Sequence, residues 1–281
     1  MKLCRYGKAG SEKPGLIDGD GRLRDLSQAV NEIGPDEISP LGLKTLAGLE
    51  AGSLPLVVGA PRFGVPYVGI GKFVAIGLNY ADHAQEAGLP VPSEPVVFMK
   101  ATTCISGPSD DIVQPKNSTR LDWEVELGVV IGTRARYVAE ADALSHVAGY
   151  CIVNDVSERA FQMATSQWDK GKSFDTAGPI GPWLVTTDEI RDPQALDMRL
   201  DVNGRRMQRG NTRTMIFNVA TIVSHVSHYM TLLPGDIIAT GTPPGVGLGI
   251  KPAPIFLKPG DVITVAIQGL GEQRQIVVAY A

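Results

Sequence analysis

An acidic strand is the sequence feature that most constrains this chain. Residues 122–127 read Asp-Trp-Glu-Val-Glu-Leu and lead into the apolar run at 129–131. Because alternate side chains of a strand point to opposite faces, a strand here places Asp122, Glu124 and Glu126 on one face. Burying neighbouring carboxylates is costly unless a cation neutralises them. The pattern therefore indicates either a solvent-exposed polar face or a site for a hard ion such as Mg²⁺, Mn²⁺ or Ca²⁺.

A third carboxylate follows the next apolar strand, which we expect at residues 149–153. Asn154-Asp155 comes directly after that strand, where an aspartate is commonly a turn or cap residue. As a ligand from a neighbouring strand end, Asp155 would complete a site with Glu124 and Glu126. Mg²⁺ takes about six oxygen ligands, so about three positions would remain for water or substrate, which is typical of a catalytic metal.

The histidines divide into one candidate catalytic pair and one structural pair. His83 and Glu86 lie three residues apart on a predicted short helix and therefore share a face. A carboxylate beside histidine orients the ring and raises its basicity, although two surface residues would show the same spacing. His225 and His228 have ligand-like spacing but lack the glutamate of a zinc protease, and we expect them to be structural or solvent-facing.

Composition excludes several classes of protein. The 281 residues allow one long domain or two, and a formal net charge of −4 without any Lys/Arg run argues against nucleic-acid binding. No apolar segment is long enough to cross a membrane or to form a signal peptide, so no membrane partner is expected. Three widely spaced cysteines indicate reduced thiols and a cytoplasmic protein. The 32 glycines and 20 prolines predict many turns and a β-rich fold.

A set of short motifs in a fixed order carries a family resemblance over about residues 70–281. The motifs are Gly77–Glu86, Phe98–Lys100, Asp122–Glu126, Asn154–Arg159, Lys170–Asp175, Gly178–Pro182, Asn211–Thr212 with Met215–Phe217, and Pro234–Asp236 through Gly241–Pro243. Each motif is weak alone, but together they resemble the fumarylacetoacetate hydrolase (FAH) family. The resemblance implies an α+β, β-rich fold: a mixed β-sandwich or roll as the catalytic domain at residues 67–281, preceded by a small α/β domain at residues 1–66.

The resemblance also implies a role for each candidate site residue. It assigns a Mg²⁺ or Mn²⁺ ion to Glu124, Glu126 and Asp155. It makes His83, Glu86 and Lys172 catalytic, and Gln162, Lys100 and Thr242 substrate-binding. Glu158 departs from the alanine that several members carry before the arginine, and nothing in the sequence explains the difference.

The implied reaction is the hydrolysis of a carbon–carbon bond in a 2,4-diketo acid, which yields pyruvate and a second acid. His83, oriented by Glu86, would take a proton from water, and Lys172 with Gln162 would stabilise the oxyanion. The N-terminal hairpin and the segment Arg209–Thr212 are most similar to the subgroup acting on 2,4-diketo-3-deoxy-L-rhamnonate or -fuconate, whose second product would be lactate.

Other functions remain open at this stage. The same metal site would serve an acylpyruvase, an oxaloacetate decarboxylase or a ureidoglycolate lyase, and the family also contains isomerases. A non-catalytic β-protein stabilised by Ca²⁺ is the alternative from another class, but it does not explain His83 beside Glu86. The resemblance further implies a homodimer or homotetramer, which is the common case for soluble enzymes.

Overall fold

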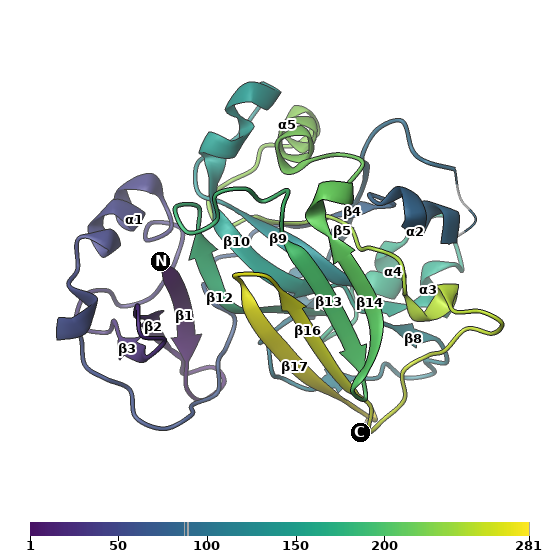
Figure 1. The fold of residues 1–281 in the computed structure, drawn as a ribbon, viewed down its shortest axis with the longest axis horizontal. Coiled ribbons are helices and arrows are strands. Elements are labelled where there is room, and N and C mark those ends of the chain that lie inside the picture. The colour runs from purple at the N-terminus through teal and green to yellow at the C-terminus, as the bar shows by residue number, and fades with distance from the viewer. Residues whose placement is uncertain (87, 89, 281) are drawn as a thin grey trace.

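The computed structural model of this protein describes residues 1–86, 88 and 90–280, and the side chain of His83 lies outside that description. Most of the regular structure is β-sheet, as predicted, and the helices are short (Figure 1). The strands are β1 (Lys2–Tyr6), β2 (Lys13–Ile17), β3 (Leu23–Asp25), β4 (Phe73–Gly77), β5 (Val96–Lys100), β6 (Ile105–Ser106), β7 (Ile112–Val113), β8 (Leu121–Asp122), β9 (Val125–Ile131), β10 (Val147–Asn154), β11 (Ser157–Glu158), β12 (Gly178–Thr186), β13 (Asp197–Val202), β14 (Arg205–Asn211), β15 (Ile237–Ala239), β16 (Val262–Ile267) and β17 (Gly271–Val278). The α-helices are α1 (Pro40–Ala47), α2 (Ala81–Glu86), α3 (Arg159–Gln162), α4 (Asp169–Lys172) and α5 (Val219–Tyr229), and five 3₁₀ turns are η1 (Ala51–Ser53), η2 (Thr102–Cys104), η3 (Glu140–His146), η4 (Thr212–Thr214) and η5 (Gly247–Gly249).

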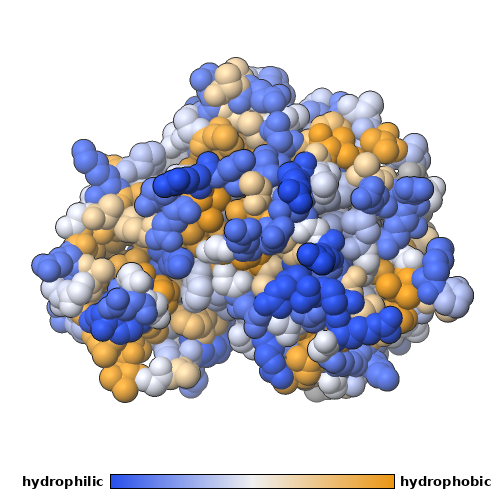
Figure 2. Space-filling view, viewed as in Figure 1, coloured by the Kyte–Doolittle hydropathy of each residue, from blue (hydrophilic) through white to orange (hydrophobic). Residues whose placement is uncertain are grey.

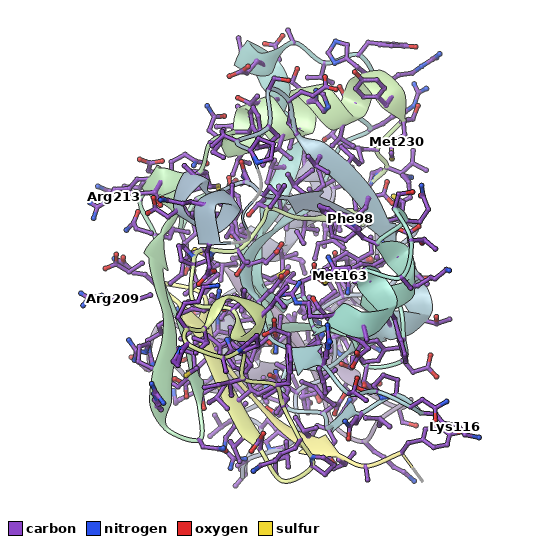
Figure 3. All side chains as sticks on the ribbon, turned by 90° about the vertical axis from the view of Figure 1, so that its right-hand side faces the viewer. Phe98, Lys116, Met163, Arg209, Arg213 and Met230 are labelled. Atoms are coloured by element: carbon purple, nitrogen blue, oxygen red, sulfur yellow. The ribbon has the colours of Figure 1, made fainter. Side chains whose placement is uncertain are left out.

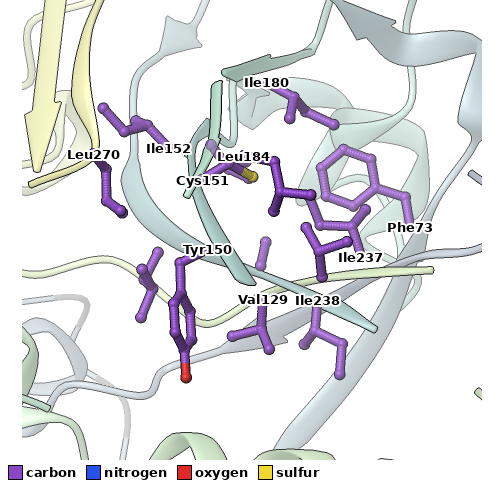
Figure 4. Packing of buried hydrophobic residues seen from close by; sticks show 14 of the residues in the cluster. Phe73, Val129, Tyr150, Cys151, Ile152, Ile180, Leu184, Ile237, Ile238 and Leu270 are labelled. Atoms are coloured by element: carbon purple, nitrogen blue, oxygen red, sulfur yellow. The ribbon is translucent and has the colours of Figure 1, made fainter. Parts of the chain in front are cut away.

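The larger sheet forms the centre of the molecule. Its strand order is β3-β2-β1-β12-β10-β9-β15-β4-β5, with β6 added beside β12. The central strands β9 and β10 are buried along their whole length, which explains why they read as continuous apolar runs in the sequence. Figure 4 shows the resulting core, in which Val129, Cys151 and Ile237 from three of these strands pack together.

A second sheet packs on the first and completes the predicted β-sandwich. Its order is β14-β13-β16-β17-β7, and Figure 1 shows β16 and β17 lying across β10 and β12. Two buried glutamines link the layers. Gln273 donates from Nε2 to the carbonyl of Ile152 at 2.8 Å, and Gln275 donates to the carbonyl of Pro108 at 2.7 Å. These bonds satisfy backbone groups that the sandwich would otherwise bury unpaired.

The N-terminal strands extend the larger sheet. Strand β1 pairs antiparallel with β12, with Leu3 opposite Leu184, so β2 and β3 form the outer edge of the same sheet. The guanidinium of Arg62 joins this part to the rest of the chain, because it contacts Glu12 at 2.8 Å and Asp110 at 2.6 Å. The domain boundary at residue 66 stays a prediction.

The acidic segment differs from the single strand expected. It forms two strands, β8 and β9, separated by Trp123 and Glu124, and these strands pair with different partners. The break arises because side chains replace backbone partners: the carboxylate of Asp122 accepts the N–H of Trp123 at 2.8 Å, and Asn154 Oδ1 accepts that of Glu124 at 3.2 Å. Asp122 therefore does not continue the acidic face of Glu124 and Glu126.

Two further features concern the surface and the helices. Figure 2 shows a strongly hydrophilic area over β13 and β14, where Arg205, Arg206 and Arg209 are exposed. Within the described residues, none of the helices has the length and apolar character needed to cross a membrane.

Candidate active site

A cavity of about 390 Å³ opens where several segments meet. Its floor holds carboxylates from the start of β9, from the break before it and from the residue after β10, and its walls come from the β4–α2 connection, β5, α3, α4 and the loop after β15. The lining residues are Ile76, Gly77, Leu78, Glu86, Phe98, Glu124, Glu126, Asp155, Arg159, Gln162, Met163, Trp168, Lys172, Thr242, Val246, Leu248, Gly249 and Lys251. In Figure 3, Phe98 and Met163 mark this region, whereas Arg209 and Arg213 lie at the opposite edge of the view.

Three carboxylates converge on the cavity floor, as the sequence predicts. One oxygen from each of Glu124, Glu126 and Asp155 lies within 4.8 Å of the other two. Antiparallel pairing of β9 with β10 produces this arrangement, since Val153 lies opposite Glu126 and the N–H of Asp155 donates to the carbonyl of Glu124 at 2.9 Å. Their exposed fractions are only 4%, 2% and 0%, which excludes the alternative of a solvated polar strand face.

Three buried cations surround the carboxylates. The ammonium of Lys172 lies 2.6 Å from Glu124 Oε2 and 2.7 Å from Asp155 Oδ2, and Arg159 Nη2 lies 2.7 Å from Glu124 Oε1. Lys100 contacts Asp155 from the other side, with Nζ 2.6 Å from Oδ1. Burial alone would lower the pKa of Lys172, but the charges of Asp155 and Glu124 outweigh burial and raise it. Lys172 is therefore a stable ammonium and a hydrogen-bond donor, not a base.

Glu126 is the carboxylate of this group with which none of these cations forms an ion pair. It accepts the N–H of Gly241 at 2.8 Å, and no described cation forms an ion pair with it. Burial raises the pKa of Glu126 strongly, and the charges of Asp155 and Glu124 raise it further. A bound cation would stabilise the ionised form of Glu126, because it would offset the repulsion from Asp155 and Glu124. The same ion could be coordinated by all three carboxylates.

The residues present fit a hard divalent ion. In this cluster the four carboxylates of Asp122, Glu124, Glu126 and Asp155 outnumber the three cations Lys100, Arg159 and Lys172 by one, and the three converging groups offer only oxygen. Carboxylate oxygens at this spacing are close enough for a single ion to be coordinated by all three groups. Mg²⁺ and Mn²⁺ prefer such oxygen ligands.

The predicted acid/base pair is placed only in part. Glu86 lines the cavity from α2, and its two carboxylate oxygens accept the N–H of Gly245 at 3.0 and 3.2 Å. His83 belongs to the same helix, but its side chain lies outside the described residues. The pairing of His83 with Glu86 stays a prediction.

The three predicted substrate-binding residues have different surroundings. Gln162 lines the cavity, and its carbonyl oxygen accepts from Arg159 Nη1 at 2.9 Å, which directs its amide NH₂ away from that bond. Thr242 also lines the cavity, but its hydroxyl donates to the Val125 carbonyl at 2.9 Å and accepts from Gln208 at 2.8 Å. Because the hydroxyl is already bonded twice, Thr242 contributes shape more than a free polar group.

Lys100 is not among the described residues that line the cavity. Its side chain is fully buried, and besides Asp155 it donates to the carbonyls of Lys172 and Ala177. The structure therefore places Lys100 behind the site, where it holds Asp155, and not against a substrate. Sequence reasoning could not separate these two positions, since both suit a lysine at the end of a strand.

Two residues with structural roles at the site were not assigned a function from the sequence. Arg159 bridges Asp122 and Glu124 across the break between β8 and β9. Glu158, the departure from the family pattern, is buried and accepts the N–H groups of Arg120 and Ala160 and the hydroxyl of Ser118. It thus caps α3, the helix that carries Arg159 and Gln162. The only sequence feature that could have indicated these roles is that Glu158 and Arg159 are adjacent in the motif Asn154–Arg159.

The backbone beside the cavity is strained at Leu78. This residue has φ +54°, which non-glycine residues adopt at a cost. Asn79 compensates, because its side chain donates to the carbonyls of Phe217 and Thr240 and accepts from the N–H of Phe217. The strained turn directs Leu78 into the cavity wall.

His225 and His228 lie on α5, away from the cavity lining, in accord with their predicted structural role.

Comparison with known proteins agrees with this geometry. The family described as fumarylacetoacetate (FAA) hydrolase C-terminal matches residues 72–278. A protein of Burkholderia multivorans that is provisionally named a hydrolase is 60% identical over 277 residues, which is 98% of each chain. Fumarylacetoacetate hydrolase from Exiguobacterium antarcticum has a TM-score of 0.87 at 37% identity and covers 100% of both chains.

Two further solved structures show the range of named activities. Maleylpyruvate hydrolase from Sphingobium sp. SYK-6, solved in complex with manganese(II) and pyruvate, has a TM-score of 0.83 at 30% identity and covers 100% of both chains. A 5-carboxymethyl-2-hydroxymuconate delta-isomerase from Mycobacterium smegmatis has a TM-score of 0.77 at 32% identity, again over 100% of both chains.

Proposed function

Because this chain belongs to the fumarylacetoacetate hydrolase family, we propose that it is a metal-dependent enzyme that hydrolyses a carbon–carbon bond of a 2,4-diketo acid and releases pyruvate. The observation that carries the proposal is the buried group of Glu124, Glu126 and Asp155 on the floor of a small-molecule-sized cavity. The bound manganese and pyruvate of the maleylpyruvate hydrolase support the same class of ligand.

Glu124, Glu126 and Asp155 would hold Mg²⁺ or Mn²⁺. When bound, the ion supplies positive charge for the carboxylate and 2-oxo oxygens of the substrate. Lys172 donates hydrogen bonds beside the same oxygens, since its ammonium lies between Glu124 and Asp155 at the cavity surface. Gln162 contributes amide N–H groups from the neighbouring helix, α3.

The residues that transfer protons in this proposal lie on helix α2. His83, oriented by Glu86, takes a proton from a water molecule, and the resulting hydroxide adds to the C4 carbonyl. The C3–C4 bond then breaks, C3 receives a proton, and one water is consumed in forming pyruvate and a second carboxylic acid. Lys172 stabilises the negative charge that develops on oxygen. The hydrogen bond from Gly245 to Glu86 keeps that carboxylate facing the cavity.

The identity of the acyl group is a finer proposal. The sequence motifs favour 2,4-diketo-3-deoxy-L-rhamnonate or -fuconate, but the segment containing Asn211 lies on β14 and is absent from the described cavity lining. Those motifs therefore give the sugar acid no support from the described cavity lining, and acylpyruvates without sugar hydroxyls are equal candidates. An isomerase acting on a 2-hydroxy-dienoate is the second candidate, because a solved neighbour at 32% identity carries such a name.

The decisive experiment measures kcat/KM for the Mg²⁺-loaded protein with diketo sugar acids, acetylpyruvate, oxaloacetate, ureidoglycolate and a 2-hydroxy-dienoate. Pyruvate and the second acid are quantified together, in water enriched in ¹⁸O. Hydrolysis predicts one ¹⁸O in the non-pyruvate acid. Carbon dioxide release from oxaloacetate would instead indicate a decarboxylase, and an absorbance change without pyruvate would indicate an isomerase. Glu126→Gln serves as the inactive control.

The assembly is a separate proposal. The family resemblance supports a homodimer or homotetramer, and sedimentation velocity at micromolar concentration tests it. A fully active monomer would overturn this part without affecting the chemistry.

A further inference from the structure

The cavity has two chemically different ends. Its floor holds the carboxylates and Lys172, which are at most 4% exposed, whereas Lys251 on its lining is an exposed residue at the mouth. A ligand that binds the floor through a 2-oxo acid therefore extends its other end toward Lys251.

The walls between these ends are mostly apolar. Phe98 and Trp168 form an edge-to-face pair with ring centroids 5.5 Å apart, and Leu248 and Met163 add aliphatic surface. Hydroxyl groups pressed against such walls would lose hydrogen bonds to water without replacement, whereas a hydrocarbon spacer would gain from burial. The walls thus favour a ligand with an apolar middle.

Lys251 has no hydrogen bond or ion pair with any part of the chain that the structure describes. The other two cations on the described lining, Arg159 and Lys172, both contact buried carboxylates. The ammonium of Lys251 is therefore the cavity-lining positive charge with its donors available to a ligand.

The loop that carries Lys251 is held in place near the site. The carboxylate of Asp122 accepts the N–H groups of Gly247 and Leu248 at 2.6 and 2.9 Å, and Glu86 accepts that of Gly245. The fit is close at Gly249, where an added Cβ would lie 2.2 Å from the carboxyl carbon of Glu86. Lys251 follows these anchors by a few residues, so its position at the mouth is fixed by the same groups that form the site.

From these observations we infer that the natural substrate carries a second anionic group, which Lys251 binds at the cavity mouth. The inference rests on the proposed function, and it specifies the substrate class as an α-keto diacid with an apolar spacer. Lys251 is then a specificity residue: it selects the diacid and takes no part in bond cleavage.

The test uses a matched pair of acylpyruvates. One has an acyl chain that ends in a carboxylate, and the other ends in the isosteric neutral carboxamide. We expect the wild-type protein to prefer the diacid by about tenfold in kcat/KM, the size of one hydrogen-bonded charge contact. Lys251→Met should remove this preference by raising KM for the diacid, while kcat and the kinetics of the carboxamide stay unchanged. Lys251→Glu should reverse the preference, and Lys251→Arg should preserve it.

Lys116→Met is the matched control, because Lys116 is exposed and Figure 3 shows it far from Phe98 and Met163. Added salt should weaken the wild-type preference and leave that of Lys251→Met unchanged. An equal preference in wild type and Lys251→Met would overturn the inference while leaving the hydrolase intact.

Cleavage of neither compound would instead contradict the proposed function. Binding then still tests the role of Lys251, through quenching of tryptophan fluorescence, because Trp168 lines the cavity. Weaker binding of the diacid by Lys251→Met than by wild type, with no change for the carboxamide, would support the inference. Equal binding would refute it.

Discussion

The ammonium of Lys100 lies 2.6 Å from Oδ1 of Asp155, and both side chains are fully buried. This contact places a cation directly behind a predicted metal ligand. The ammonium of Lys172 contacts the other oxygen of the same carboxylate, Oδ2, at 2.7 Å, so Asp155 is held from two sides.

Lys100→Met should therefore act mainly on stability. Removing one partner of a buried ion pair leaves an uncompensated charge, and we expect the free energy of unfolding in EDTA to fall by about 3 kcal/mol. Urea denaturation measures the change, with Lys116→Met as the exposed control that should differ by less than about 0.5 kcal/mol. An unchanged stability together with a raised KM would return Lys100 to the role of a substrate contact.

Glu126→Gln should separate metal binding from folding. In EDTA the variant should be at least as stable as the wild type, because the change removes a carboxylate that burial disfavours and that Asp155 and Glu124 repel. Mg²⁺ or Mn²⁺ should then raise the melting temperature of the wild type and not that of the variant. Calorimetric titration with Mn²⁺ checks the affinity, which should fall at least about tenfold, the effect of losing roughly 1.4 kcal/mol. The exposed Glu50→Gln is the control, and equal affinities would contradict the assignment.

Removal of the metal should abolish activity in the wild type. Three of the cavity-floor groups are carboxylates, and no described residue on the cavity lining offers a thiolate or an imidazole ligand. A hard ion is expected to restore turnover after EDTA treatment, with Mg²⁺ and Mn²⁺ both effective. Full turnover in metal-free protein would refute a catalytic metal.

His83→Ala should reduce kcat by about 10²–10⁴, the usual contribution of a general base, with little effect on metal affinity. The prediction rests on the three-residue spacing of His83 and Glu86 on α2. Single-turnover kinetics with a cleaved acylpyruvate measure the effect on the chemical step. An unchanged kcat would favour a decarboxylase, which needs no nucleophilic water.

Acid should weaken the link between the N-terminal strands and the sandwich. Burial alone would raise the pKa of Asp110, but hydrogen bonds from Arg62 and Gly107 outweigh it and lower the pKa below its ordinary value of 3.8. The unfolded chain binds its proton at the ordinary pKa, so this stabilisation is complete above that pKa and is lost as the pH falls through the lowered one. The pKa of Glu12 is also lowered. Burial alone would raise it, but the hydrogen bond from Arg62 is the main contribution that outweighs burial.

Arg62→Met should consequently lower the free energy of unfolding by about 1–2 kcal/mol at pH 7, because the pairs are partly exposed. The difference from wild type should shrink below about pH 3, where the carboxyl groups gain protons. Urea denaturation at both pH values provides the comparison. A constant difference across this range would show that packing of the Arg62 side chain, and not its charge, supplies the stability.

The sequence by itself determined the class of fold and most of the candidate metal site. Apolar runs long enough for fully buried strands predicted β9 and β10, strand alternation predicted that Glu124 and Glu126 share a face, and the family resemblance added Asp155. The first two features are local, because strand alternation and apolar runs follow from neighbouring residues alone. The same locality explains why His83 and Glu86 could be proposed as a pair.

Only the tertiary structure decided which charges meet. Asp122 and Lys100 are as polar in the sequence as the predicted metal ligands, yet Asp122 bonds to Arg159 and to a loop more than a hundred residues later, and Lys100 lies behind Asp155. Likewise, Lys251 becomes part of the cavity only because its loop docks on distant carboxylates. Sequence patterns specify which face of an element a side chain occupies, whereas the partner across that face depends on how the sheets stack and the loops close, which is set by packing over the whole chain.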